Sequence, residues 1–138
     1  MKLLTIAVLV LVVIAAQVGL ARAQEQKTLT QTPSEFQTFY ARFRGAVLKK
    51  DRKAVVALTS FPFEYGWDAG DEGNYTETEF IGKFDDIFGG AKKLFAQKNP
   101  KFYFHDDSYD LFNEEDASHY FFRKEGGTYK FISLIVEP

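Results

Sequence analysis

Aromatic residues are the feature that most constrains the fold of this chain. Its 138 residues include 15 Phe, 7 Tyr and 1 Trp, and all of them follow residue 23. A packed aromatic side chain buries about 150–250 Å², so a small domain can fill its core with rings or use some of them to wall a cavity. We expect both uses, and we predict that Phe43, Phe84 and Phe131 are buried between helices and sheet.

The first 23 residues have the pattern of a cleavable signal peptide. Lys2 gives a positive start, residues 3–16 are an uninterrupted apolar run, and Ala21-Arg22-Ala23 places small residues where a signal peptidase cuts. The alternative is an uncleaved membrane anchor, because the apolar stretch approaches the roughly 20 residues that span a bilayer. Gln17 and the small-residue site argue against an anchor, so we expect cleavage after residue 23 and export to the bacterial periplasm or the extracellular medium.

The chain after the signal is one domain of ordinary size. It retains all 19 acidic residues and all but two of the 17 basic ones, and the two signs are interspersed. This mild negative charge gives no basic surface for nucleic acid. The absence of cysteine excludes a disulfide framework and a lipid-modified cysteine. We expect a loose polar leader over residues 24–33 and a folded domain over residues 34–138.

Three segments have apolar residues at helical spacing. The first begins after Thr32, which can cap a helix that has Pro33 in its first turn. The second follows a cap at Asp51 and is short. The third follows a capping box formed by Thr76 and Glu79 and runs to a pair of glycines at residues 89–90, with one or two further helical turns over residues 91–97.

The pattern changes to strand-like alternation from Lys101 onward. Alternating segments cover residues 101–105, 118–123 and 128–136, and the last has apolar residues on both faces, which is typical of a central strand. A further short strand is expected over residues 61–65, whereas residues 106–113 could form either a strand or an acidic loop. The order of elements predicts an α+β fold in which a curved antiparallel sheet packs on three helices.

This arrangement resembles the nuclear transport factor 2-like superfamily. The resemblance rests on Phe36-x-x-Phe-Tyr-x-x-Phe, on the Leu-Thr-Ser-Phe-Pro-Phe that ends at Phe63, and on the segment from Tyr120 to Ile135. It covers most of residues 34–136, although many relatives have tryptophan at the position of Tyr129. It implies a cone-shaped fold, shared with ketosteroid isomerases, scytalone dehydratase and exported bacterial domains of unknown function, and a homodimer formed through the outer face of the sheet.

The resemblance also implies a concave pocket inside the cone. We expect Tyr65 and Trp67 near its mouth, with Tyr103 and His119 as further ligand-binding residues. The first functional hypothesis is therefore a non-catalytic exported domain. It would bind a small apolar or amphipathic ligand in this pocket, or a partner in the cell envelope, without a cofactor.

The second hypothesis is a cofactor-free isomerase, dehydratase or hydrolase of a small hydrophobic substrate. Enzymes of the superfamily place a carboxylate against an apolar wall that raises its pKa enough for general base work. His105 and Asp106 are the candidates for that role, but the family's catalytic set cannot be matched here residue by residue. No serine elbow or phosphate-binding loop is present in the sequence.

The sequence offers two weak matches to calcium-binding loops. The segment from Asp68 to Glu79 agrees with an EF-hand loop at its first, sixth and twelfth positions, but Gly70 and Glu72 occupy positions that normally supply ligands. A shorter acidic pattern at residues 106–110 lacks the glycine that turns such a loop. We therefore expect no metal site, and interpret both segments as acidic surface turns.

Overall fold

The computed structural model describes residues 25–68 and 70–138. The predicted signal peptide, residues 1–23, lies outside the described residues. Within the described ranges, no helix has the length and apolar character needed to cross a membrane.

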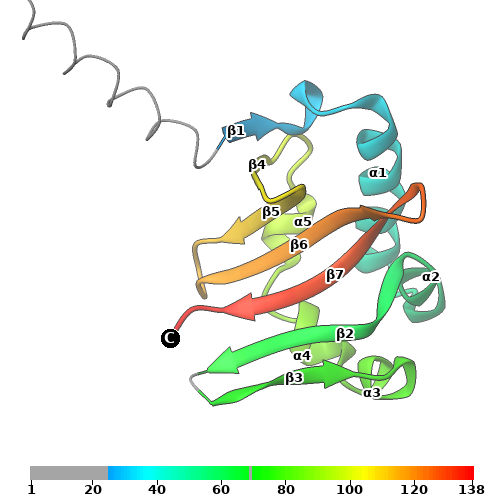
Figure 1. Cartoon of the computed structure of the whole chain (residues 1–138), viewed down its shortest axis with the longest axis vertical. Helices are drawn as coiled ribbons and strands as arrows, with labels where there is room; N and C mark the ends of the chain where they lie inside the picture. Colours follow the sequence, from blue (N-terminus) through cyan, green and yellow to red (C-terminus); the bar gives the residue numbers. More distant parts are fainter. Residues whose placement is uncertain (1–24, 69) are drawn as a thin grey trace, which may run out of the picture.

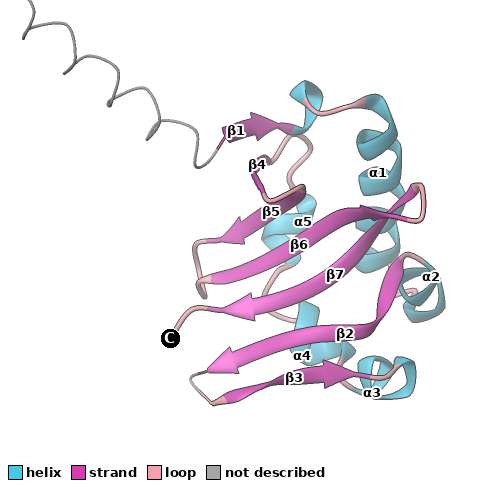
Figure 2. Cartoon of the chain, in the orientation of Figure 1, coloured by secondary structure: helices cyan, strands magenta, loops and turns pink. Residues whose placement is uncertain are grey.

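The fold is α+β, with a seven-stranded sheet covered on one face by helices (Figures 1 and 2). In spatial order the strands are β1 (Glu25–Thr28), β4 (Lys101–His105), β5 (Ser108–Asn113), β6 (Ser118–Glu125), β7 (Thr128–Val136), β2 (Thr59–Asp68) and β3 (Asp71–Tyr75). The helices are α1 (Ser34–Leu48), α2 (Arg52–Ala57), α3 (Glu77–Gly82), α4 (Phe84–Phe88) and α5 (Lys92–Ala96).

The prediction of a purely antiparallel sheet is wrong, because the sheet is mixed. β2 runs parallel to β7, whereas the other neighbouring strands are antiparallel. A tight hairpin turn forces its two strands to run in opposite directions. Along the chain, β2 and β7 are separated by four strands and three helices, so no turn sets their relative direction. The segment left open by the sequence, residues 106–113, forms a tight turn and the strand β5.

The prediction of a loose leader over residues 24–33 is wrong for its described part. Glu25–Thr28 pairs with β4 as an edge strand, and Leu29–Gln31 forms a 3-10 helix. This edge strand has no apolar alternation because none of its residues is buried. The predicted cap at Thr32 is also wrong: its hydroxyl donates to the Leu29 carbonyl (2.6 Å), and α1 begins at Ser34 without a side-chain cap.

The other two predicted caps are confirmed. The Asp51 carboxylate accepts a hydrogen bond from the Ala54 N–H (3.1 Å) at the start of α2. Thr76 and Glu79 form the reciprocal capping box at the start of α3. These local signals depend on residues three positions apart, so the sequence alone predicts them well.

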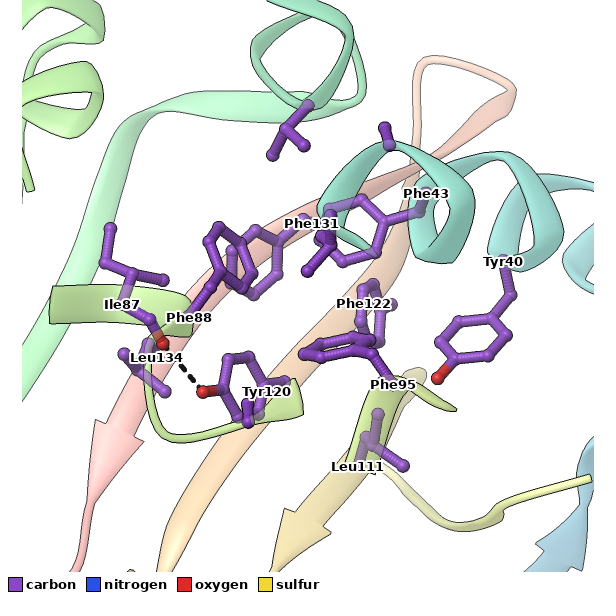
Figure 3. Packing of buried hydrophobic residues seen from close by; sticks show 14 of the residues in the cluster. Tyr40, Phe43, Ile87, Phe88, Phe95, Leu111, Tyr120, Phe122, Phe131 and Leu134 are labelled. Carbon is purple, nitrogen blue, oxygen red and sulfur yellow. Dashed lines mark hydrogen bonds between the residues drawn. The ribbon is translucent and has the colours of Figure 1, made fainter. Parts of the chain in front are cut away.

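The predicted third helix is instead two helices, because the backbone leaves helical geometry at Lys83 (φ −100°, ψ 6°). Because of this break, α3 and α4 contact two different strands of the sheet. Phe80 of α3 packs on Phe63 of β2, with ring centroids 5.0 Å apart. From α4, Ile87 accepts a hydrogen bond from the Tyr120 hydroxyl of β6 (2.7 Å), which Figure 3 shows as a dashed line.

Aromatic rings fill the space between helices and sheet. Phe43 of α1 lies against Phe122 of β6 and Phe131 of β7, with ring centroids 5.1 Å apart in both pairs (Figure 3). The predicted burial of Phe43, Phe84 and Phe131 is confirmed, with 0%, 2% and 0% of their surfaces exposed. Other fully buried rings belong to Phe36, Tyr40, Phe63, Phe80, Phe95, Phe102, Tyr120 and Phe122.

A bulge in β7 changes which of its residues face the helices. Phe122 pairs with Phe131 but Phe121 pairs with Ser133, which leaves Ile132 as an extra residue. The bulge reverses the alternation, so both Phe131 and Leu134 are buried in the core. The simple alternation predicted for this strand therefore holds only on each side of the bulge.

We expect Phe43→Ala to lower the free energy of unfolding by about 3–5 kcal/mol, because the truncation leaves a cavity among packed rings. Urea unfolding followed by far-ultraviolet circular dichroism measures this loss. Leu48→Ala in the same helix is the control, since Leu48 is 38% exposed and its truncation is expected to cost about 0.5 kcal/mol or less. Equal losses in the two variants would contradict the packing described.

Candidate functional site

The expected pocket among Tyr65, Trp67 and Tyr103 does not form. Tyr65 stacks on Tyr75 with centroids 4.0 Å apart, and the Trp67 indole donates to the Tyr75 hydroxyl (2.7 Å). Tyr103 lies on β4, and three strands separate β4 from β2 in the sheet. Packed rings fill the helix-facing side of the sheet, so the candidate site lies elsewhere.

β4 and β5 form a hairpin that opens at its far end. The turn residues Asp106 and Asp107 both have positive φ (50° and 60°), the geometry of a two-residue type I′ turn. Such a turn makes the flanking residues, His105 and Ser108, a hydrogen-bonded pair.

Hydrogen-bonded pairs then recur at every second residue of the ladder. Tyr103 with Asp110 is the next such pair, and the ladder ends there. Lys101 with Phe112 would follow, but these residues are not paired, so the strands separate at this point. The backbone N–H and C=O groups of Lys101 and Phe112 therefore face the gap between the two strands.

A cleft of about 460 Å³ lies at this gap. Tyr103 and Phe112 contribute aromatic rings to its lining, and both are half-buried. Four residues with side-chain amides also line it, namely Gln26, Gln97, Asn99 and Asn113. The cleft thus combines apolar surface with groups that donate and accept hydrogen bonds, and Tyr103 is the sequence-predicted ligand residue that it contains.

A buried carboxylate lies beside the cleft, on the sheet face opposite the helices. Asp110 is only 4% exposed, and its Oδ2 is 2.8 Å from Nδ1 of His119 and 3.9 Å from Nε2 of His105. These are the two histidines of the chain. They occupy diagonal positions on the strands either side of β5, so they approach the carboxylate from opposite ends.

The environment of Asp110 determines its chemistry. Burial raises the pKa of Asp110, and the hydrogen bond and positive charge supplied by His119 offset part of the rise. The other ring nitrogen of His119 lies 2.7 Å from a carboxylate oxygen of Glu137. Both nitrogens of His119 thus face carboxylates, and neither points to a position where a substrate could bind.

This network supports the wall of the cleft. The His119 ring lies against Phe112, with centroids 4.6 Å apart, and stacks with Phe121 at 5.9 Å. Because Asp110 and Glu137 hold His119 at its two nitrogens, the imidazole is a fixed support for the Phe112 ring. His119, predicted to bind ligand, therefore lies behind the cleft rather than in its lining.

His105 and Asp106, the candidates for a general base, are not arranged as one in the structure. The Asp106 side chain is 99% exposed on the turn, 3.6 Å from Nδ1 of His105. A carboxylate in water lacks the apolar surroundings that would raise its pKa for general base work. In the described ranges, no three His, Asp or Glu side chains are grouped so that they could hold a metal ion, and residues 71–75 of the EF-hand-like segment form strand β3.

Asp110 and Phe112 are the residues that the sequence analysis missed. The signal for them is the Asp106-Asp107 pair between two alternating segments, because aspartate tolerates the positive φ that both positions of a two-residue type I′ turn require. Once that turn is assigned, the register puts Asp110 opposite Tyr103. The separation of the strands beyond this pair has no local sequence signal.

The comparisons with known proteins leave the family open. No protein-family model matches the chain, and no curated protein matches it. Among solved structures, the chain is similar to the crystal structure of a protein of unknown function with a cystatin-like fold from Nostoc punctiforme. The identity is 15%, the TM-score is 0.41, and the alignment covers 75% of this chain and 88% of that one. With this TM-score the match does not establish a shared fold.

We expect Asp110→Asn to change how stability depends on pH. Because the folded-state pKa of Asp110 is raised, its contribution to stability is complete below the unfolded value of about 3.8 and is lost as the pH rises through the folded-state value. The unfolding free energy of the parent should therefore fall relative to that of the variant as pH rises from about 3 to about 5.5, below the usual histidine range.

Urea melts at each pH measure this difference. Glu137 and the two histidines are present in both proteins, so the comparison isolates Asp110. The control Asp106→Asn, at a 99% exposed side chain, should show no such trend. A parent that gains stability over Asp110→Asn in this window would show that the hydrogen bond from His119 outweighs burial, and would contradict the account.

Proposed function

We propose that this protein is an exported, non-catalytic binding domain with the cone-shaped nuclear transport factor 2-like fold, and that it binds a small amphipathic ligand in the cleft between β4 and β5. The observation that carries the proposal is the cleft itself, together with the backbone groups that face it beyond the last ladder pair. Its volume of about 460 Å³ is within the usual range for small-molecule sites, about 300–1,000 Å³.

The construction of the cleft suits binding. Its two aromatic residues, Tyr103 and Phe112, lie on strands held in the sheet by their neighbours β1 and β6. Side chains on strands are positioned more rigidly than side chains on loops, which reduces the entropy lost when a ligand binds. Rings and amides together favour a ligand with both apolar and polar faces.

Catalysis is the less favoured function. In an enzyme of this fold, a carboxylate or histidine would face the bound substrate and accept a proton from it. Asp110 and His119 are the pair with suitable chemistry, but Asp110 is 4% exposed and His119 is held at both nitrogens. The buried polar network therefore supports the site without reaching into it.

The test compares two tyrosines on different strands, Tyr103→Ala and Tyr65→Ala. A panel of small neutral, acidic, basic and aromatic compounds is screened for a rise in melting temperature, since a ligand that binds only the folded state must stabilise it. We expect hits for the parent and for Tyr65→Ala, and none for Tyr103→Ala. Trp67 emission should stay unchanged, because Trp67 lies outside the cleft lining.

Two results would contradict the proposal. The first is stabilisation that disappears in Tyr65→Ala but persists in Tyr103→Ala, which would place the site at β2. The second is no stabilisation by any compound together with a mass that rises with protein concentration. That outcome would favour the homodimer implied by the family resemblance, formed through the outer face of the sheet.

A further inference from the structure

The chemistry of the cleft is specific enough to indicate its ligand class, if the proposed function holds. Its first element is the backbone of Lys101 and Phe112, which lies beyond the last ladder pair and directs N–H and C=O groups into the gap. Polar backbone groups that are shielded from water need partners. A ligand that fills the gap must therefore both donate and accept hydrogen bonds within a short distance.

The second element is a pair of available side-chain amides. Gln26 of β1 is paired in register with Tyr103, and Gln97 follows the end of α5. No hydrogen bond within the described part of the chain uses either side-chain amide. A carboxamide donates through its nitrogen and accepts through its oxygen, so it matches a hydroxyl group, which also does both.

The third element is the balance of charge. Lys93 and Glu115 at the rim form an ion pair with 3.7 Å between nitrogen and oxygen. The other charged residues of the lining are Lys101 and Glu114, one of each sign. A lining without net charge gives no electrostatic preference for a phosphate or a carboxylate, and therefore favours a neutral ligand.

The fourth element is shape. Lys101 follows Pro100, which has no N–H, and β5 ends at Asn113. The unpaired edge is thus one residue pair long, whereas an extended peptide that adds to a sheet needs several successive pairs. The ring faces of Tyr103 and Phe112 are electron-rich and suit the C–H groups on one face of a pyranose ring.

We propose that the cleft between β4 and β5 binds a neutral sugar unit, with its hydroxyls on the Lys101 and Phe112 backbone and the Gln26 and Gln97 amides, and with its C–H face on Tyr103. The inference rests on the proposed function of this cleft. It narrows that function from a small amphipathic ligand to a polyhydroxylated one.

The experiment is a titration of the nitrogen-15-labelled protein with cellobiose, maltose and N,N′-diacetylchitobiose, followed by two-dimensional NMR. We expect saturable shifts of the Lys101 and Phe112 backbone amides and of the Gln97 side-chain amide for at least one of the three sugars. Gln97→Ala should weaken its binding about fivefold, as the loss of one neutral hydrogen bond implies. The control Lys98→Ala, one residue away and outside the lining, should bind as the parent does.

A second pair of variants tests the role of the ring. Tyr103→Ala should weaken sugar binding by about tenfold, the value of a stacked aromatic contact, whereas Tyr103→Phe should retain it because the ring face remains. A Tyr103→Phe variant that binds as poorly as Tyr103→Ala would show that the hydroxyl, not the ring face, makes the contact, and would overturn this part of the inference.

Two charged probes and one peptide probe distinguish a failure of the sugar assignment from a failure of the proposed binding function. Glucuronic acid, glucose 6-phosphate and N-acetylalanine methylamide are titrated under the same conditions. Shifts at the cleft with one of these probes, and none with the neutral sugars, would overturn the sugar assignment and leave the proposed binding function standing. Sugar-induced shifts confined to other surfaces would also overturn it. No shift at the cleft with any probe would overturn both proposals.

Discussion

The packing of rings between α1 and the central strands is the interaction on which the rest of the structure depends. Phe43 lies between Phe122, Phe131 and Phe95, with centroid separations of 5.1, 5.1 and 6.0 Å. The pocket expected inside a cone-shaped fold would leave this space open for a ligand, whereas here side chains fill it. The same packing that stabilises a domain without disulfides therefore leaves the candidate site at the gap between β4 and β5.

Asp110 links the sheet face opposite the helices to the cleft. Burying a carboxylate costs free energy, and the hydrogen bond with His119 offsets part of that cost. The same histidine packs against the cleft residue Phe112. The backbone of Asp110 is also the last partner of β4, at Tyr103, before the strands separate. Asp110 thus lies at the end of the β4–β5 ladder and also holds His119, which supports the Phe112 ring.

The sequence predicted the features that depend on near neighbours. The caps at Asp51 and Thr76 are set by residues three positions away, and the burial of Phe43 and Phe131 follows from helical and strand periodicity. The edge strand at Glu25–Thr28 could not be predicted in this way, because its stability comes from pairing with β4, far along the chain. The prediction that Tyr65 and Tyr103 line one pocket was wrong for a related reason, because local sequence patterns do not determine the order of strands in a sheet.

Amide hydrogen exchange measured by NMR tests the central claim most directly. The account predicts that the backbone N–H groups of Lys101 and Phe112 exchange rapidly in the free protein, while those of Tyr103 and Asp110, two residues along the same strands, are protected by the ladder. A saturating ligand in the cleft should slow exchange at Lys101 and Phe112. If Phe112 is already as protected as Asp110 in the free protein, the strands stay paired, and the account of the cleft is wrong.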